Sequence, residues 1–345
     1  MKRLRREDLT LLERHIASAS RITITAHAHP DGDALGSTVG LLSFLRSRRG
    51  CSDCMIVLPD KIAPSLNFVT RGYGRDILTP QMHPGEVSER IRTSDLIFCL
   101  DCAGFSRTEG LEGMFKASGA KKILIDHHLG PQKEDFCLVF SETEISSASE
   151  LLFYILTEME DGAPLPYNTG RALMCGMTTD TNNFANSVFP TTLDMASALL
   201  QQGIDRDSIV QKAFNTYRVR RLRLLGHLLD SKLVIVGNGA YMIMTKEEER
   251  RFDIREGETE GFVNIPLSAG RIKMSVFLKE TDDAHFRVSV RSKKGWSANA
   301  FARRYFHGGG HENASGGKLF FPGDIPGPQD AAAYVEKAMI EFLKK

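Results

Sequence analysis

The 345-residue sequence lacks a marked excess of charge of either sign, and it lacks long hydrophobic runs. Its 44 lysine and arginine residues are balanced by 43 aspartate and glutamate residues, which gives a net charge of +1. No global field therefore attracts nucleic acid or a membrane, and any binding of anions must be local. The apolar runs fall short of the roughly 20 residues that cross a bilayer. The charged amino terminus lacks the apolar core of a signal peptide, so we expect a cytoplasmic protein with no membrane partner.

Cysteine is also scarce, with six residues in the chain. Two pairs have C-x-x-C spacing, Cys51 with Cys54 and Cys99 with Cys102. Such spacing can indicate zinc, but the two pairs lie far apart in the sequence. Cys99 also lies within the apolar run 95–100, where a buried free thiol is the simpler interpretation. We expect all six to be reduced, as is usual in the cytoplasm.

The amino-terminal part of the sequence alternates short apolar runs with helical patterns. The runs that predict strands are 22–25, 55–58, 95–100, 122–125 and 136–140. The helices we predict are 3–19, 34–50, 147–159, 168–179, 191–202 and 205–214. Continuous apolar strands separated by helices are typical of a parallel sheet covered on both faces, so the pattern predicts an α/β fold.

The pattern changes near residue 187. Residues 217–232 predict an amphipathic helix, and we interpret its arginines as a solvated face, with an anionic cleft as the alternative. Strand patterns follow in 233–244, 271–280 and 285–293, with a hairpin signal at Asn238-Gly239. Helices are predicted at 297–306 and 328–344. We therefore predict a parallel-sheet catalytic domain over 1–187, a helical linker over 188–232 and a smaller α/β domain over 233–345.

Potential metal ligands follow three of the predicted strands and end one helix. They are His27, Asp31, Asp33, Asp101, His127 and Asp180. Since the carboxyl ends of parallel strands meet at one edge of a sheet, we expect the strand-end residues to converge. Carboxylates with some imidazole suit two divalent ions, with Mn²⁺ favoured and Mg²⁺, Co²⁺ or Zn²⁺ as alternatives. Such a centre activates water and clamps a phosphoryl group, and Asp101 is best placed to bridge the ions.

The triplet Asp126-His127-His128 offers three separable roles. His127 can bind metal, and Asp126 can hold an imidazole in the correct tautomer. His128 can then face a substrate phosphate as a donor or a proton source. We do not count His29 among the metal ligands, and we expect its side chain to lie beside the metal or to face the substrate.

A second constellation lies near the carboxyl terminus. Gly308, Gly309 and Gly310 precede His311, and consecutive glycines let a ligand approach the backbone N–H groups closely. The pair Arg291-Ser292 lies a few residues earlier. A glycine run alone is more often a flexible loop, but this combination predicts a grip for phosphate or a nucleotide.

Together these motifs resemble the DHH–DHHA1 phosphoesterases, which are named for the Asp-His-His triplet. The first-domain motifs are His27-x-x-Pro30-Asp31-x-Asp33, Asp101, Asp126-His127-His128 and Asp180 within Thr179-Asp180-Thr181. The second-domain motifs are Arg291-Ser292 and the glycine run with Ala314 and Gly316. One departure is Asn182, where the family commonly has glycine.

The resemblance implies roles for individual residues. One metal ion would be held by His27, Asp31 and Asp101, and the other by Asp33, Asp101, His127 and Asp180. The catalytic residues would be Asp101, Asp126 and His128, with His128 in contact with the scissile phosphate. The residues implied in substrate binding are Arg107, Arg291, Ser292, Gly309, Gly310 and His311.

The compact length resembles the NrnA-type members of the family. This implies a Mn²⁺-dependent oligoribonuclease, with exonuclease and 3′(2′),5′-bisphosphate nucleotidase activity, acting in a cleft between the domains. The implied substrates are short RNA oligomers, pApA-type dinucleotides and 3′-phosphoadenosine 5′-phosphate (pAp). No binding of long duplex DNA is expected, and a homodimer is left open. The alternatives are a polyphosphatase or pyrophosphatase, and a catalytically silent nucleotide-binding relative, against which the complete ligand set argues.

Overall fold

The computed structural model describes residues 4–216 and 218–344. The chain divides into two compact units, Met1–Thr216 and Tyr217–Lys345. Residues 1–3, 217 and 345, which include the first residue of each of the predicted helices 3–19 and 217–232 and the ends of the predicted domains, lie outside the described residues. The predicted linker 188–232 is divided between the two units at 216/217.

The first unit contains a six-stranded parallel sheet, which confirms the predicted α/β class. Its strands are β1 (Arg21–Thr25), β2 (Asp53–Val57), β3 (Ile77–Leu78), β4 (Leu96–Leu100), β5 (Lys121–Asp126) and β6 (Leu138–Ser141). Their order in the sheet is β3-β2-β1-β4-β5-β6, so the chain reverses direction across the sheet between β1 and β4. Ligands bind at the carboxyl ends of the strands at such a switch point.

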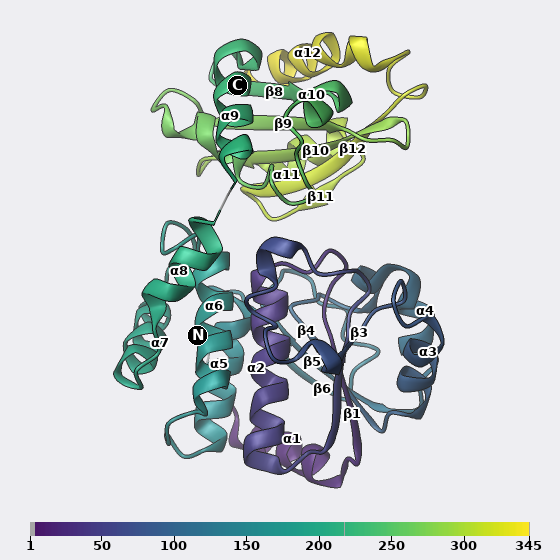
Figure 1. Cartoon of the computed structure of the whole chain (residues 1–345), viewed down its shortest axis with the longest axis vertical. Helices are drawn as coiled ribbons and strands as arrows, with labels where there is room; N and C mark the ends of the chain where they lie inside the picture. Colours follow the sequence, from purple (N-terminus) through teal and green to yellow (C-terminus); the bar gives the residue numbers. More distant parts are fainter. Residues whose placement is uncertain (1–3, 217, 345) are drawn as a thin grey trace. The chain divides into compact units, whose positions relative to one another are not determined.

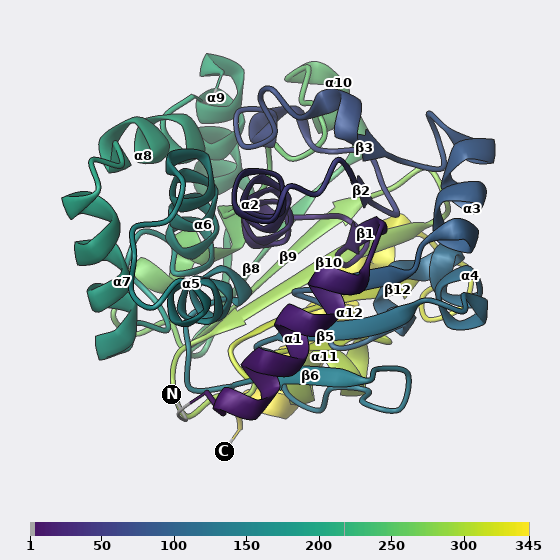
Figure 2. The ribbon, with the colours of Figure 1, turned by 90° about the horizontal axis from the view of Figure 1, so that it is seen from below.

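Helices cover both faces of this sheet (Figures 1 and 2). One face carries α1 (Arg6–Ser18), α2 (Gly32–Arg49), α5 (Ala148–Met159) and α6 (Tyr167–Asp180), with α7 (Pro190–Gln201) and α8 (Arg206–Phe214) beyond them. The other face carries α3 (Pro84–Thr93) and α4 (Glu112–Ala117). The sequence patterns did not predict α3, α4 or β3, because α3 is highly charged and the other two are short.

Helices α2 and α6 touch through their backbones. A Cβ on Gly36 would lie 2.7 Å from the carbonyl oxygen of Ala172 and from the backbone of Gly176. A Cβ on Gly176 would lie 2.0 Å from the Ser149 hydroxyl and 2.7 Å from an Asp33 carboxylate oxygen. Glycine therefore sets the separation of the two helices that carry Asp33 and Asp180.

The second unit is a mixed six-stranded sheet with the strand order β11-β12-β10-β9-β8-β7. Its strands are β7 (Val234–Val236), β8 (Gly239–Met244), β9 (Met274–Glu280), β10 (His285–Ser292), β11 (Gly309–Gly310) and β12 (Ala314–Phe320). Among the described strands of this second sheet, only β8 and β9 pair in parallel. Its helices are α9 (Val219–His227), α10 (Lys246–Arg251), α11 (Ala298–Tyr305) and α12 (Ala331–Leu343). None of the helices in the described part of the chain has the length and hydrophobicity needed to cross a membrane.

Two sequence interpretations change here. The hairpin is present, but Val236 pairs with Gly239, so its turn is Gly237-Asn238 and Gly239 already belongs to β8. The solvated-face interpretation of the arginines in 217–232 is wrong for Arg221. That side chain is buried, its guanidinium lies 4.6 Å from the centre of the Phe262 ring, and it donates a hydrogen bond to the backbone of Glu260. Because an arginine can stack on an aromatic ring, a helical charge pattern alone does not reveal such burial.

Gly36→Ala tests the backbone contact between α2 and α6. We expect it to lower the free energy of unfolding by about 1–3 kcal/mol, because neither backbone can yield without moving a helix. Gly113→Ala in α4 is the matched control, since its Cβ would meet no atom within 4 Å, and alanine in a helix is favoured over glycine. Urea denaturation followed by circular dichroism would compare them. Equal stabilities would show that the helices are not held at backbone contact.

Candidate metal centre

His27 lies two residues after the end of β1, and its ring orientation is fixed by the backbone. Its Nδ1 donates a hydrogen bond of 2.7 Å to the carbonyl oxygen of Ala28. Its Nε2 therefore faces Asp101, with 3.4 Å to Oδ2, and Asp31, with 3.9 Å to Oδ1. A histidine whose Nδ1 is bonded in this way presents Nε2 as a ligand atom.

Two aspartates at the start of α2 are held by helix amino termini. Asp31 caps α2, and its Oδ1 accepts hydrogen bonds of 3.0 Å from the backbone N–H groups of Asp33 and Ala34. Asp33 reaches α5, where its oxygens accept from the N–H groups of Ala148 at 2.7 Å and Ser149 at 3.0 Å. These bonds hold two carboxylates in place without placing a cationic side chain on them.

Asp101 lies at the centre of the group, just after β4. Its backbone has the positive φ of 50°, which aspartate tolerates better than most residues, and the residue is 2% exposed. Oδ2 lies 3.4 Å from Nε2 of His27, and Oδ1 lies 3.3 Å from Nε2 of His127. Oδ1 is buried without a hydrogen-bond partner. A buried carboxylate oxygen without a donor fits a metal ligand, so the residues present suit the expected ions.

The six predicted ligands fall into two groups. His27, Asp31 and Asp101 each offer an atom within 4.8 Å of the others, and so do Asp33, His127 and Asp180. His127 connects the groups, because its Nε2 lies 3.3 Å from Asp101 Oδ1 and 3.6 Å from Asp180 Oδ2. The structure thus brings together all the residues that the sequence motifs nominated as ligands.

The charges in this cluster shift one another's pKa values. Burial alone would raise the pKa of Asp101, but the neighbouring imidazoles of His127 and His27 outweigh it and hold the pKa well below its usual range. Burial opposes the charged form of the two imidazoles, yet Asp101 raises the pKa of each to about 10. Burial, together with the charges of Asp101 and Asp180, raises the pKa of Asp33 well above its usual range. A divalent cation would take the place of these protons.

The Asp180 end of α6 leads into a tight turn. The family-deviating Asn182 has φ of 46°, and Asn183 and Phe184 have φ of 59° and 65°. Asparagine is the residue that, after glycine, most readily adopts this left-handed conformation. Asn182 is therefore compatible with the turn that glycine commonly makes.

A chain of hydrogen bonds joins Asp126, His128 and Arg107. Asp126 Oδ1 lies 2.7 Å from Nδ1 of His128, and its Oδ2 accepts from the backbone N–H of His128 at 3.1 Å. Nε2 of His128 lies 2.8 Å from a guanidinium nitrogen of Arg107. Because arginine can only donate, Nε2 is the acceptor and Nδ1 carries the proton. Arg107 is itself fixed, since its carbonyl oxygen accepts from the backbone N–H of Ala28 at 2.8 Å.

His29 belongs to a separate cluster. Its Nδ1 lies 3.4 Å from Asp60, and its Nε2 lies 4.0 Å from Glu109. These three residues also offer atoms within 4.8 Å of one another, but His29 and Glu109 are largely exposed. No pattern in the sequence pointed to Asp60 or Glu109, because neither follows a strand with a recognisable ligand spacing.

The predicted substrate residues of the second unit lie on β10, on β11 and in the turn that follows β11. The Arg291 guanidinium donates to the carbonyl oxygens of Val290 at 3.0 Å and Ser315 at 3.4 Å. Burial lowers the pKa of Arg291, and no carboxylate lies within ion-pair distance of it among the described residues. The Ser292 hydroxyl already donates to the Trp296 carbonyl and accepts from Asn313. Arg291 is therefore the stronger candidate for binding a phosphate group.

The three glycines of the run differ in whether packing requires the absence of a side chain. A Cβ on Gly308 would lie 1.9 Å from the carbonyl oxygen of Gly316, and one on Gly310 would lie 2.8 Å from that of Ala314. Packing of β11 on β12 therefore requires both glycines. A Cβ on Gly309 would meet only Arg303, at 3.8 Å. Gly309 is the position whose glycine is not explained by packing, and it is free for approach by a ligand.

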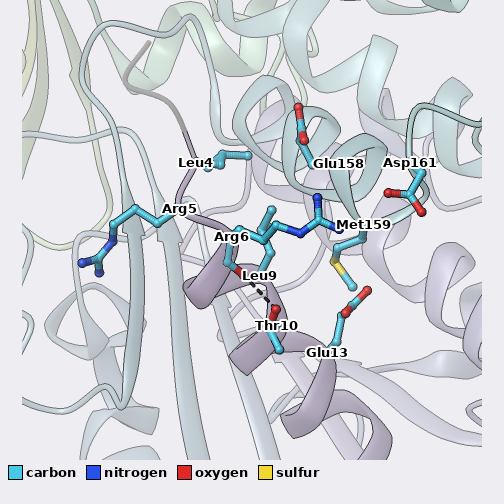
Figure 3. A pocket seen from close by; sticks show the side chains of 9 residues that line it. All are labelled: Leu4, Arg5, Arg6, Leu9, Thr10, Glu13, Glu158, Met159 and Asp161. Carbon is cyan, nitrogen blue, oxygen red and sulfur yellow. Dashed lines mark hydrogen bonds between the residues drawn. The ribbon is translucent and has the colours of Figure 1, made fainter.

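A cavity of about 490 Å³ lies elsewhere, between α1 and the carboxyl end of α5. Figure 3 shows the side chains around it, among them Arg6, Glu13, Glu158 and Asp161. None of the sequence motifs contributes to its lining. We therefore assign no function to this cavity.

The chain matches known protein families in both units. A model of the DHH family, N-terminal domain, matches residues 21–177, and a model of the DHHA1 domain matches residues 237–338. The chain belongs to the DHH family. This confirms the resemblance that the motifs suggested. DHH proteins are metal-dependent phosphoesterases, in agreement with the acidic and imidazole cluster of this DHH protein.

Known relatives resemble the chain over most of its length. The solved structure of an exopolyphosphatase-related protein from Bacteroides fragilis is 34% identical, covers 100% of both chains and has a TM-score of 0.91. The probable bifunctional oligoribonuclease and PAP phosphatase NrnA of Streptococcus mutans is 26% identical over 310 residues, or 88% of this chain and 91% of NrnA. The cyclic-di-AMP phosphodiesterase GdpP of Geobacillus thermodenitrificans is 24% identical over 86% of this chain but only 44% of its own length.

Replacing one of two nearby histidines tests the ligand assignment. We expect His27→Ala to weaken Mn²⁺ binding about tenfold to a hundredfold, because it removes an imidazole whose Nε2 faces Asp101. His29→Ala, only two residues away, should leave the affinity unchanged. Isothermal titration of both variants with Mn²⁺ makes the comparison. Loss of binding in His29→Ala alone would move the metal site to the cluster with Asp60 and Glu109.

Proposed function

We propose that this DHH protein hydrolyses phosphate esters of short nucleotide substrates, namely RNA oligomers of a few residues, pApA-type dinucleotides and pAp. The observation that carries the proposal is the Asp101 carboxylate, buried between His27 and His127 with one oxygen lacking a hydrogen-bond donor. The similarity to NrnA of Streptococcus mutans, which is named an oligoribonuclease and PAP phosphatase, supports the substrate class.

Two divalent ions fit the ligand groups, and we propose Mn²⁺. His27, Asp31 and Asp101 would hold one ion, and Asp33, Asp101, His127 and Asp180 the other. When bound, the ions would supply Lewis acidity to a phosphoryl group and lower the pKa of water. Asp101 would serve both ions, since its two oxygens face different histidines.

The chain Asp126–His128–Arg107 would present a positive charge to the phosphate. Asp126 holds the Nδ1–H tautomer of His128, and Nε2 then fixes one nitrogen of the Arg107 guanidinium. The other guanidinium N–H groups can bind phosphate oxygens, which arginine does with directed hydrogen bonds. In this arrangement Arg107 contacts the substrate, and His128 and Asp126 position the Arg107 side chain. This differs from the expectation that His128 itself contacts the phosphate.

The second unit would bind the remainder of the substrate. Arg291 supplies a partly buried guanidinium with no carboxylate at ion-pair distance among the described residues, and such a charge favours an anion. Gly309 and Gly310 lie on β11, which β12 separates from β10, His311 lies in the turn after β11, and Ser292 adjoins Arg291. We propose these residues as the site for a phosphate away from the scissile bond.

A second candidate function is hydrolysis of inorganic polyphosphate or pyrophosphate. The exopolyphosphatase-related protein of Bacteroides fragilis favours it, with 34% identity over the whole chain. A catalytically silent nucleotide-binding protein is less well supported, because all six metal-ligand candidates are present and clustered.

A substrate panel distinguishes these functions. Purified protein with Mn²⁺ would be assayed with pAp, pApA, a five-nucleotide RNA, pyrophosphate and polyphosphate. We expect turnover of the three nucleotide substrates and little release of phosphate from the inorganic ones. Turnover confined to polyphosphate or pyrophosphate would overturn the nucleotide assignment in favour of the second candidate.

Asp101→Asn tests the metal-dependent step in the same assay. The change keeps the side-chain shape but removes the charge that both ions would share, so kcat should fall more than about a hundredfold. Asp60→Asn is the matched control, because Asp60 is an aspartate of the neighbouring His29 cluster, and its kcat should be retained. Circular dichroism would establish that both variants are folded. Full turnover by Asp101→Asn would contradict the two-metal assignment.

A further inference from the structure

One face of the second sheet is covered over only part of its width. On β8 and β9, Met242, Met244 and Phe277 pack against α9 and the 3₁₀ turn Phe262–Ser268. On β10 and β12, the residues of the same face alternate with buried ones and are partly or fully exposed. This uncovered face consists of Arg287, Ser289 and Arg291 on β10 and Ala314, Gly316, Lys318 and Phe320 on β12.

Two cations on the uncovered face oppose each other directly. Arg287 pairs with Lys318 in the β10–β12 register, and both are exposed. Like charges in opposed positions destabilise a sheet. The next residue in the same row, Lys279, is neutralised by Glu249 at 2.5 Å. Arg287 and Lys318 form no ion pair within the described residues, so this row retains two positive charges that the fold does not use.

An aromatic ring lies next to these cations. Phe320 follows Lys318 by two residues on β12, which places it on the same face, and it is 38% exposed. Its ring is flanked by His285 and His307, each with 5.6 Å between ring centres. His307 is in turn held by Asp324 at 2.8 Å. The ring is thus held in position while part of its surface remains open.

Between the cations and Arg291 the face is nearly flat. The intervening row contains Gly309, Gly316 and Ser289, which project no side chain larger than a hydroxymethyl group. At 3.4 Å per residue, Arg287 lies about 14 Å and His285 about 20 Å from Arg291 along β10. Along the strands, the face therefore presents Arg291, then a row without large side chains, then the cations Arg287 and Lys318, and then the ring of Phe320.

We propose that the uncovered face binds single-stranded RNA beyond the first phosphate site, with phosphate held by Arg287 and Lys318 and a base stacked on Phe320. The proposal extends the proposed function and rests on it. Cationic residues that follow the backbone, together with exposed aromatic rings, are what single strands require. Polyphosphate could use the cations, but it has no group to stack on Phe320. A nucleotide as short as pAp would occupy the Arg291 end alone.

Binding to a hydrolysis-deficient protein tests the proposal. Asp101→Asn protein would be titrated in Mn²⁺ buffer with a five-nucleotide RNA by fluorescence anisotropy and with pAp by calorimetry. Adding Arg287→Ala with Lys318→Ala, or Phe320→Leu alone, should weaken RNA binding about tenfold and leave pAp binding unchanged. Without the two cations, the slope of log Kd for RNA against log salt concentration should fall by about 0.7 for each phosphate that they neutralise, whereas Phe320→Leu should leave the slope unchanged. Arg250→Ala with Lys337→Ala removes two exposed cations from α10 and α12 and should change neither ligand's affinity.

The other outcomes would overturn the proposal in distinguishable ways. Unchanged RNA binding in both variants would show that the face is not used. Equal weakening of RNA and pAp would indicate a general disturbance of the second unit instead of an extended site. Weakened binding of polyphosphate without any effect on RNA would reassign the cations to an inorganic polyanion. If the unmodified Asp101→Asn protein binds neither RNA nor pAp, the proposed function itself fails, before the face is tested.

Discussion

The geometry of the candidate metal centre depends on one buried carboxylate, Asp101, held between two imidazoles. A buried charge is tolerated only where opposite charge or hydrogen bonds surround it. Here each oxygen faces a different histidine, His27 from the end of β1 and His127 from the end of β5. The strand order that puts β4 between β1 and β5 is therefore what makes this arrangement possible. The left-handed backbone at Asp101 turns the carboxylate into the group, at a cost that the surrounding contacts offset.

Helices α2, α5 and α6 position two further carboxylates of the candidate centre. Asp33 is bonded to the amino terminus of α5, and Asp180 ends α6. Both positions depend on close approach of α2, α5 and α6, which glycine permits at Gly36 and Gly176. A larger residue at Gly176 would meet the Asp33 carboxylate directly. In this unit, helix packing therefore determines where the candidate ligands lie. A change that moved the helices apart would also move these carboxylates apart.

The sequence predicted those parts of the molecule in which local pattern and position agree. Continuous apolar runs located β1, β4 and β5, and the polar residues just beyond them identified candidate ligands that the structure brings together, because strand ends in a parallel sheet must meet. Short or charged elements such as β3, α3 and α4 carry too little pattern to be seen. The stacking of Arg221 on Phe262 and the bond between Arg107 and His128 join segments far apart in the chain. No local spacing encodes such contacts, so they required the structure.

A protein with a net charge of +1 can bind anions only by leaving particular cations without partners. Some arginines are paired with carboxylates, as Arg218 is with Glu258 at 2.6 Å. Among the cations of the described second unit that form no ion pair, Arg291, Arg287 and Lys318 lie together on one face of a single sheet. Strand alternation fixes which side chains share that face. The placement of these cations therefore follows from strand register, as the placement of the candidate metal ligands follows from strand order. The balance of charge over the whole chain thus conceals a local excess where a chain of phosphates would gain most from it.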